Sequence, residues 1–130
     1  TQMVRTLSFG NPSKESEGAY TACLAALETA ETFLKPGYST IEVFKAIHDT
    51  IEQAGYQMGL HPGHSQGLDI FERPLIDGKD DVTLKEGMII ILHPHVLIPS
   101  GGGVWVGETF VITPEGYHRL NKCDRDLQVL

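Results

Sequence analysis

The 130-residue sequence lacks the features that mark several specialised classes of protein. Only two cysteines occur, Cys23 and Cys123, and they have no metal-binding or redox spacing, so we expect free thiols rather than a disulfide framework. No apolar run reaches the roughly 18 residues of a membrane helix. The net charge is −7, which disfavours nonspecific nucleic-acid binding because phosphates require a basic face. The sequence therefore predicts a cytoplasmic protein that binds neither membranes nor nucleic acid.

The first half of the chain predicts a short strand followed by two amphipathic helices. Apolar residues within 3–9 indicate the strand. Ser13 is placed to cap a helix over residues 14–34, whose apolar side chains recur at three- and four-residue spacing. Ser39 opens a capping box for a second helix, which Gly55 ends.

Most of the remaining chain is typical of strands and turns. Residues 68–72 alternate apolar and polar side chains and predict a half-buried strand. Residues 88–98 form a long apolar strand interrupted at His93-Pro94-His95, and residues 104–113 pair back as a hairpin after a glycine-rich turn. A strand, two helices and then several antiparallel strands indicate the α+β class.

A histidine bracketed by glycines is the first candidate for a functional site. Gly63 and Gly67 allow the backbone to bend or to approach another group closely. His64 between them is held near the chain axis, where an imidazole can meet a substrate or a metal. The alternative interpretation is a glycine-rich turn with an incidental surface histidine.

Four blocks of sequence support the functional interpretation. They are GHSQGLDIFERP at 63–74, LKEGMIIILHP at 84–94, GVWVGETFVITPEG at 103–116 and MVRTLSFGNPS at 3–13. In this order and spacing they resemble the creatinase, aminopeptidase P and prolidase superfamily, which includes Xaa-Pro dipeptidases and methionine aminopeptidase-like proteins.

The resemblance implies half of a pita-bread fold, with two helices packed on a curved, mostly antiparallel sheet. Residues 1–130 would be the C-terminal part of one catalytic domain, and the N-terminal part would be absent from this chain. Because family members often pair, and because a sheet cut at residue 2 would expose an edge strand, we expect a homo-oligomer.

The metal site of that family is changed at most of its positions. Its metal-dependent members hold two divalent ions with two aspartates, one histidine and two glutamates. The resemblance places the first aspartate before residue 1 and the other four ligands at Gln2, His64, His93 and Gly107. Since two divalent cations need several carboxylates, the resemblance implies that the usual two-metal site cannot form, and no metal cofactor is expected.

The groups around the metal site differ as well. The resemblance aligns a second family histidine with Phe71, whereas Glu72 retains the acidic residue that follows it. Another family histidine aligns with Leu60, one residue before His61. The expected substrate-binding residues are His61, Glu72 and His95.

Three functions remain open from the sequence. The first is a metal-free hydrolase in the manner of creatinase, which acts on a small molecule or short peptide through His64, His93 and Glu108, with either histidine as general base. The second is a binding pseudoenzyme or assembly module that has lost the reaction. The third is a rebuilt site with a single zinc or manganese ion on His64, His93 and His95. Glu108 alternates with Gly107 and should therefore face away from the missing ligand position.

Overall fold

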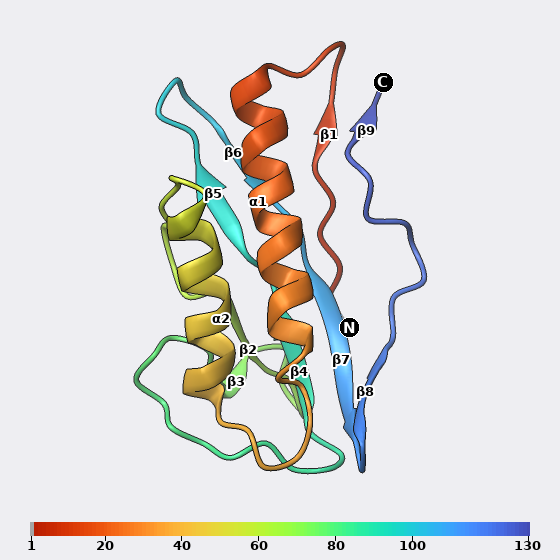
Figure 1. Cartoon of the computed structure of the whole chain (residues 1–130). Helices are drawn as coiled ribbons and strands as arrows, with labels where there is room; N and C mark the ends of the chain where they lie inside the picture. The colour runs from red at the N-terminus through yellow and green to blue at the C-terminus, as the bar shows by residue number, and fades with distance from the viewer. Residues whose placement is uncertain (1) are drawn as a thin grey trace.

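The computed structural model describes residues 2–130 and has two helices on one side of a set of short strands (Figure 1). In chain order the elements are β1 (Leu7–Ser8), α1 (Lys14–Glu31), α2 (Thr40–Gln53), β2 (Gly63–Ser65), β3 (Glu72–Leu75), β4 (Ile89–Leu92), β5 (His95–Leu97), β6 (Gly103–Trp105), β7 (Glu108–Thr113), β8 (Gly116–Arg119) and β9 (Gln128–Val129). This arrangement confirms the α+β class.

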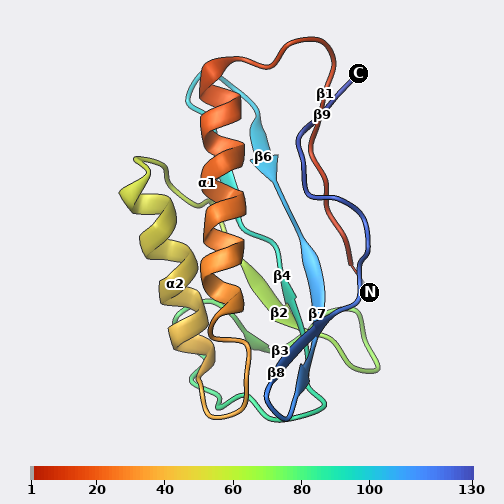
Figure 2. The same ribbon diagram turned by 45° about the vertical axis from the view of Figure 1, so that its right-hand side comes forward.

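The main sheet contains five antiparallel strands in the order β3-β2-β4-β7-β8. The β5–β6 hairpin forms a separate pair, and β1 pairs in parallel with β9. Figure 2 shows both helices on one face of the strands. No helix of residues 2–130 lies on the opposite face, which we call the uncovered side. Within residues 2–130, neither helix combines the length and the apolar character that crossing a membrane requires.

Both predicted helix starts are confirmed by their caps. The Ser13 hydroxyl accepts a backbone N–H of the first turn of α1, and Ser39 and Glu42 form a reciprocal capping box at α2. α1 ends at Glu31, three residues before the predicted end. The next residues form a tighter turn, in which the Leu34 N–H donates to the Glu31 carbonyl at 3.1 Å.

One hydrophobic core fills the space between the helices and the sheet. Its fully buried side chains come from both helices and from the central strands, and they include Leu27, Ile47, Ile51, Ile90 and Phe110. Burial of each such side chain contributes roughly 1.5–3 kcal/mol. The core therefore lies on the helix-facing side of the sheet.

Residues 68–71 do not form the half-buried strand that the alternation over 68–72 predicted, and their apolar side chains are exposed; only Glu72 lies in a strand, as the first residue of β3. The chain bends here because the Glu72 carboxylate accepts the N–H of Asp69 at 2.7 Å. The strand β2 lies earlier, where Gly63 allows a close approach to β4. A Cβ on Gly63 would collide with the carbonyl oxygen of Ile91.

The strands predicted over residues 88–98 and 104–113 are each divided in two. Pro94 has no N–H with which to continue the ladder between β4 and β5. Gly107, which lies between β6 and β7, forms a bridge with Val4 instead. The first predicted strand is correspondingly reduced to this bridge and β1.

Candidate functional site

The register of the central strands separates two rows of side chains. His64 pairs with Ile91, which pairs with Thr109 on β7. In the adjacent row, Leu92 pairs with Glu108. Directly paired residues point to the same face of a sheet, and neighbours along a strand point to opposite faces. Leu92 belongs to the core under the helices, so Glu108 faces the helices and His64 faces the uncovered side.

On the uncovered side, four imidazoles lie close together with two other aromatic rings. This histidine cluster consists of His61, His64, Phe71, His93, His95 and Trp105. The ring centroids of His64 and His93 are 5.3 Å apart, and those of His61 and His93 are 5.9 Å apart. His64 is 2% exposed and His93 is 8% exposed. The structure therefore brings together sequence-predicted residues from β2, from β5 and from the segments flanking β2 and β4.

Hydrogen bonds fix the tautomer of His64. Its Nδ1 lies 2.8 Å from the carbonyl oxygen of Ser65, a group that can only accept. Nδ1 therefore carries the proton, and the lone pair of the neutral ring is on Nε2. His93 is less constrained, because its Nδ1 is buried and has no hydrogen-bond partner among residues 2–130. A buried polar atom without a partner is uncommon in folded proteins and marks this ring as a functional candidate.

Both nitrogens of His95 are engaged. Its Nδ1 lies 3.3 Å from the His93 carbonyl oxygen, and its Nε2 accepts the backbone N–H of Leu60 at 2.8 Å. His95 thus stabilises the segment before β2, and its ring packs against Trp105 with centroids 5.3 Å apart.

Burial keeps these imidazoles uncharged. Removal from water lowers the pKa of His64 and that of His95, and it lowers the pKa of His93 to about 4. The neighbouring histidines add to the effect at His93, because a second positive charge nearby is unfavourable. All three rings are therefore neutral at pH 7 and can accept a proton or donate from one nitrogen only.

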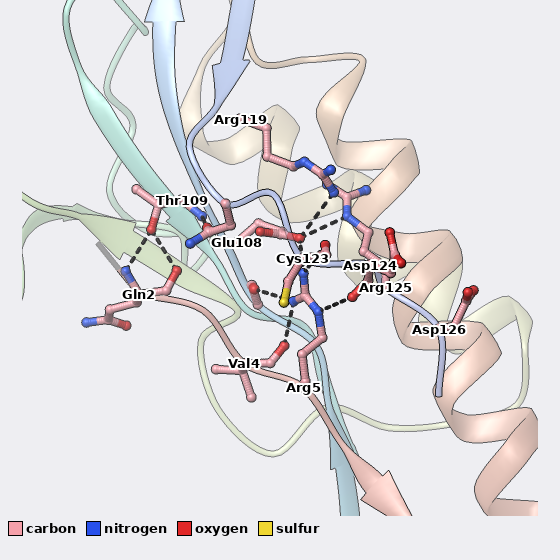
Figure 3. Close-up of polar contacts among 12 residues, drawn as sticks. Gln2, Val4, Arg5, Glu108, Thr109, Arg119, Cys123, Asp124, Arg125 and Asp126 are labelled. Atoms are coloured by element: carbon pink, nitrogen blue, oxygen red, sulfur yellow. Dashed lines mark hydrogen bonds and ion pairs between the residues drawn. The ribbon is translucent and has the colours of Figure 1, made fainter. Parts of the chain in front are cut away.

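Glu108 lies in a different environment, shown in Figure 3. The side chain is fully buried, and its Oε1 accepts from Arg5 at 2.5 Å, Arg125 at 3.0 Å and Arg119 at 3.4 Å. Arg125 also pairs with Glu31 on α1. We call these five residues the Glu108 ion-pair cluster. The structure does not place Glu108, one of the expected catalytic groups, beside His64 and His93.

The other expected substrate-binding residues are divided between the cluster and its surroundings. His61 contacts Phe71 and His93 through its ring. The Glu72 carboxylate is engaged with the bend at residues 67–71, where it accepts the Asp69 N–H.

Two of the positions that the resemblance assigns to family metal ligands, Gln2 and Gly107, carry no carboxylate. A Cβ on Gly107 would lie 3.0 Å from Val4 Cγ2 and 3.2 Å from His93 Cβ, so a carboxylate side chain there would require movement of its neighbours. The Gln2 amide donates to the carbonyl of Ile70 at 3.2 Å. Among residues 2–130, no group of three or more His, Cys, Asp or Glu side chains is arranged to hold a metal ion.

Sequence reasoning missed Trp105 and the arginines around Glu108. The Trp105 Nε1–H donates to the His93 carbonyl at 2.8 Å and so links β6 to the histidine cluster. Arg5 lies 103 positions before Glu108, so no local spacing could have revealed the ion pair. The one available signal was a glutamate at the start of an apolar strand.

The chain is similar in sequence to a metallopeptidase family and to individual dipeptidases. The profile of Metallopeptidase family M24 matches residues 1–114. The sequence is 36% identical over 129 residues to an Xaa-Pro dipeptidase from Pyrococcus furiosus. The alignment covers 98% of this chain and 37% of that protein. It is 31% identical over 128 residues to an Xaa-Pro dipeptidase from Lactobacillus helveticus, covering 97% of this chain and 35% of that protein.

Solved structures of similar proteins confirm the predicted pita-bread fold. An Xaa-Pro dipeptidase from Bacillus anthracis superposes with a TM-score of 0.94 at 30% identity, covering 100% of this chain and 37% of that chain. A prolidase from Pyrococcus horikoshii gives a TM-score of 0.92 at 33% identity, with 96% and 37% covered. The chain thus spans a little over a third of the length of these relatives.

Proposed function

Because the chain belongs to metallopeptidase family M24, we propose that the protein containing it is a hydrolase that cleaves a C–N bond of a small amide or amidine substrate without the two metal ions usual in that family. The observation that carries the proposal is the pair of buried, neutral imidazoles of His64 and His93, 5.3 Å apart on the uncovered side of the sheet. Since the chain spans about a third of its relatives, the activity is that of the whole protein.

In the proposed mechanism His64 is the general base. Its Nε2 takes a proton from water as the water oxygen bonds to the amide or amidine carbon. The resulting imidazolium returns a proton to the leaving nitrogen as the C–N bond breaks. The Ser65 carbonyl supports this role, because it accepts from Nδ1–H and stabilises the imidazolium. His93 is the neighbouring proton carrier, and His61 contacts the substrate.

The test is turnover of a panel of small amides, amidines and Xaa-Pro dipeptides by the full-length protein, measured as release of amine or ammonia. His64→Ala should lower kcat at least 100-fold, in line with the usual contribution of a general base. His118→Ala is the matched control, because His118 is exposed on β8 and should leave kcat unchanged. Unchanged turnover in His64→Ala would refute the proposal.

The proposed absence of a metal requirement is tested separately. The full-length protein, purified without chelator and then soaked with zinc and manganese, should retain less than about a tenth of an equivalent of either metal. About one tightly held equivalent, lost in His64→Ala, would instead establish a single-ion site on His64 and His93. Two equivalents would show that the placement of the family ligands in this sequence is wrong.

A non-catalytic binding module on the same fold is the second candidate. Close contact among the rings of the histidine cluster favours it, because packed aromatic rings leave little room for a substrate and its attacking water. Here a small ligand would raise the melting temperature without forming product. Hydrolysis of that same ligand would exclude this alternative.

A further inference from the structure

A cavity of about 500 Å³ lies beside the histidine cluster, between residues 4–6, residues 59–60 and the β5–β6 hairpin. This volume is within the range of small-molecule sites. Its walls carry three large apolar side chains that are unusually exposed, namely Leu60 at 69%, Leu97 at 63% and Trp105 at 42%.

A glycine keeps part of this cavity open. A Cβ on Gly59 would lie 3.2 Å from Leu97 Cδ1 and 3.5 Å from His95 Nε2. A side chain at position 59 would therefore occupy space between these two walls.

The arginine in the cavity wall has no donor left for a ligand. A guanidinium has five N–H groups, and those of Arg5 are all engaged within the protein. One donates to Glu108 Oε1, and the others donate to the carbonyls of Val4, Gly107, Cys123 and Asp124. Arg5 cannot bind an anionic ligand without breaking the Glu108 ion-pair cluster.

The other polar side chains of the wall are engaged as well. The Thr6 hydroxyl donates to the Trp105 carbonyl at 2.8 Å and accepts the Trp105 N–H at 2.9 Å. Both ring nitrogens of His95 are already hydrogen-bonded within the protein. A charged group entering the cavity would lose its hydration without gaining a partner, which is strongly unfavourable.

Trp105 connects the cavity to the candidate catalytic groups. Its ring is part of the cavity wall and lies 5.6 Å from the His93 ring, centroid to centroid. A molecule seated against the Trp105 ring therefore contacts a side chain that itself packs against His93.

We propose that this cavity binds an uncharged apolar group, such as a ring or a branched aliphatic chain, of a small molecule whose remaining atoms extend towards His64 and His93. As a statement about the substrate, this inference rests on the proposed function. As a statement about binding, it is independent of catalysis. The cavity thus selects against ligands that place a carboxylate or an ammonium group there.

Trp105 provides the readout, because it is the only tryptophan in the chain. In the full-length protein carrying a single tryptophan at this position, fluorescence would be titrated with benzamide, 4-carboxybenzamide and 4-(aminomethyl)benzamide, which share the amide and the ring and differ in the charge at the end of the ring that enters the cavity. Benzamide should give a saturable change and bind at least tenfold more tightly than either charged analogue. No saturable change with benzamide, or equal or tighter binding of a charged analogue, would overturn the proposal.

Variants then locate the site. Leu97→Glu should weaken benzamide binding at least tenfold, whereas Leu68→Glu, which alters a fully exposed residue outside the cavity, should not. Leu97→Lys repeats the test with the opposite charge, and circular dichroism checks that each variant folds. Equal loss of binding in Leu68→Glu would refute the assignment.

Two further measurements separate ligand binding from self-association and from catalysis. Sedimentation that shows concentration-dependent association, abolished by Leu97→Glu and unaffected by benzamide, would overturn the proposal and assign the cavity to a second copy of the protein. His64→Ala should retain benzamide binding. Absence of hydrolysis would therefore not contradict the binding inference, and absence of benzamide binding would not contradict the proposed hydrolase activity.

Discussion

The two faces of the sheet at β4 and β7 bury ionisable groups in opposite ways. On the helix-facing side, the charge of Glu108 is balanced by three arginines. On the uncovered side, His64 and His93 are neutral, and His93 Nδ1 has no partner. Among residues 2–130, Glu108 Oε2 is buried without a hydrogen-bond partner, as His93 Nδ1 is, so the two faces differ in charge balance rather than in complete bonding. A buried charge held by several counter-ions is typical of a structural contact, whereas buried neutral imidazoles are typical of sites that need them for chemistry or binding.

The largest effect should come from removing the partnered charge. Glu108→Ala leaves Arg5 and Arg125 without their shared carboxylate, and loss of one partner of a buried pair typically costs about 3–5 kcal/mol. The free energy of unfolding from urea titration measures this cost. Glu115→Ala, at an exposed turn position, should change it by less than about 0.5 kcal/mol. A cost below about 1 kcal/mol for Glu108→Ala would remove the distinction between the faces.

On the uncovered face, His93 should make the stability of the protein depend on pH. His93 has a pKa of about 4 in the folded protein, below the 6.5 of an unfolded histidine, so the unfolded chain binds more protons between these values. The neutral His93 ring therefore makes its full contribution to the free energy of unfolding above pH 6.5. As the pH falls towards 4, the free energy of unfolding decreases by roughly 3 kcal/mol on account of this residue. Urea titrations of wild type and His93→Gln at several pH values from 7.5 to 4 give, for each protein, the slope of the free energy of unfolding against pH. Equal slopes in the two proteins would contradict the assignment.

A glycine pair tests how closely the uncovered face is packed. A methyl group at position 107 meets Val4 and His93 at 3.0–3.2 Å, whereas one at Gly116 has no heavy atom within 4 Å. Gly107→Ala should therefore cost about 1–3 kcal/mol through overpacking, while Gly116→Ala should be close to neutral. Adding Val4→Ala should recover part of the cost. If the two glycine variants were equally stable, the uncovered face would have room for a larger side chain.

The smallest effect concerns the edge of the Glu108 ion-pair cluster. Arg119 is 34% exposed and 3.4 Å from Glu108, while Arg125 is 14% exposed and also pairs with Glu31. Arg119→Gln should cost no more than about 1 kcal/mol, as expected for a partly solvated ion pair, and the cost should shrink in high salt. Arg125→Gln should cost more. The reverse order would show that Arg119 is the principal counter-ion.

Local sequence signals predicted the helices because their causes are local. The Ser13 cap and the Ser39 capping box depend on residues three positions apart. The bend after Gly67 was not predictable from alternation, because the long-range pairing of β2 with β4 and the Glu72 carboxylate override it. The candidate site likewise has one part with a local sequence signal and one part that depends on long-range contacts. A glycine-flanked motif indicated His64, whereas Arg5 reaches Glu108 only through the fold.

The pairing of β1 with β9 joins the two ends of the described chain. The Leu130 N–H donates to Ser8 and the Gly10 N–H donates to Leu130, both at 2.8 Å, and β1 and β9 lie side by side in Figure 1. Strands that protect each other's amides open together, so hydrogen exchange should report one common opening energy for both segments. The first and last stretches of this chain then behave as a single cooperative unit, although about 120 residues separate them.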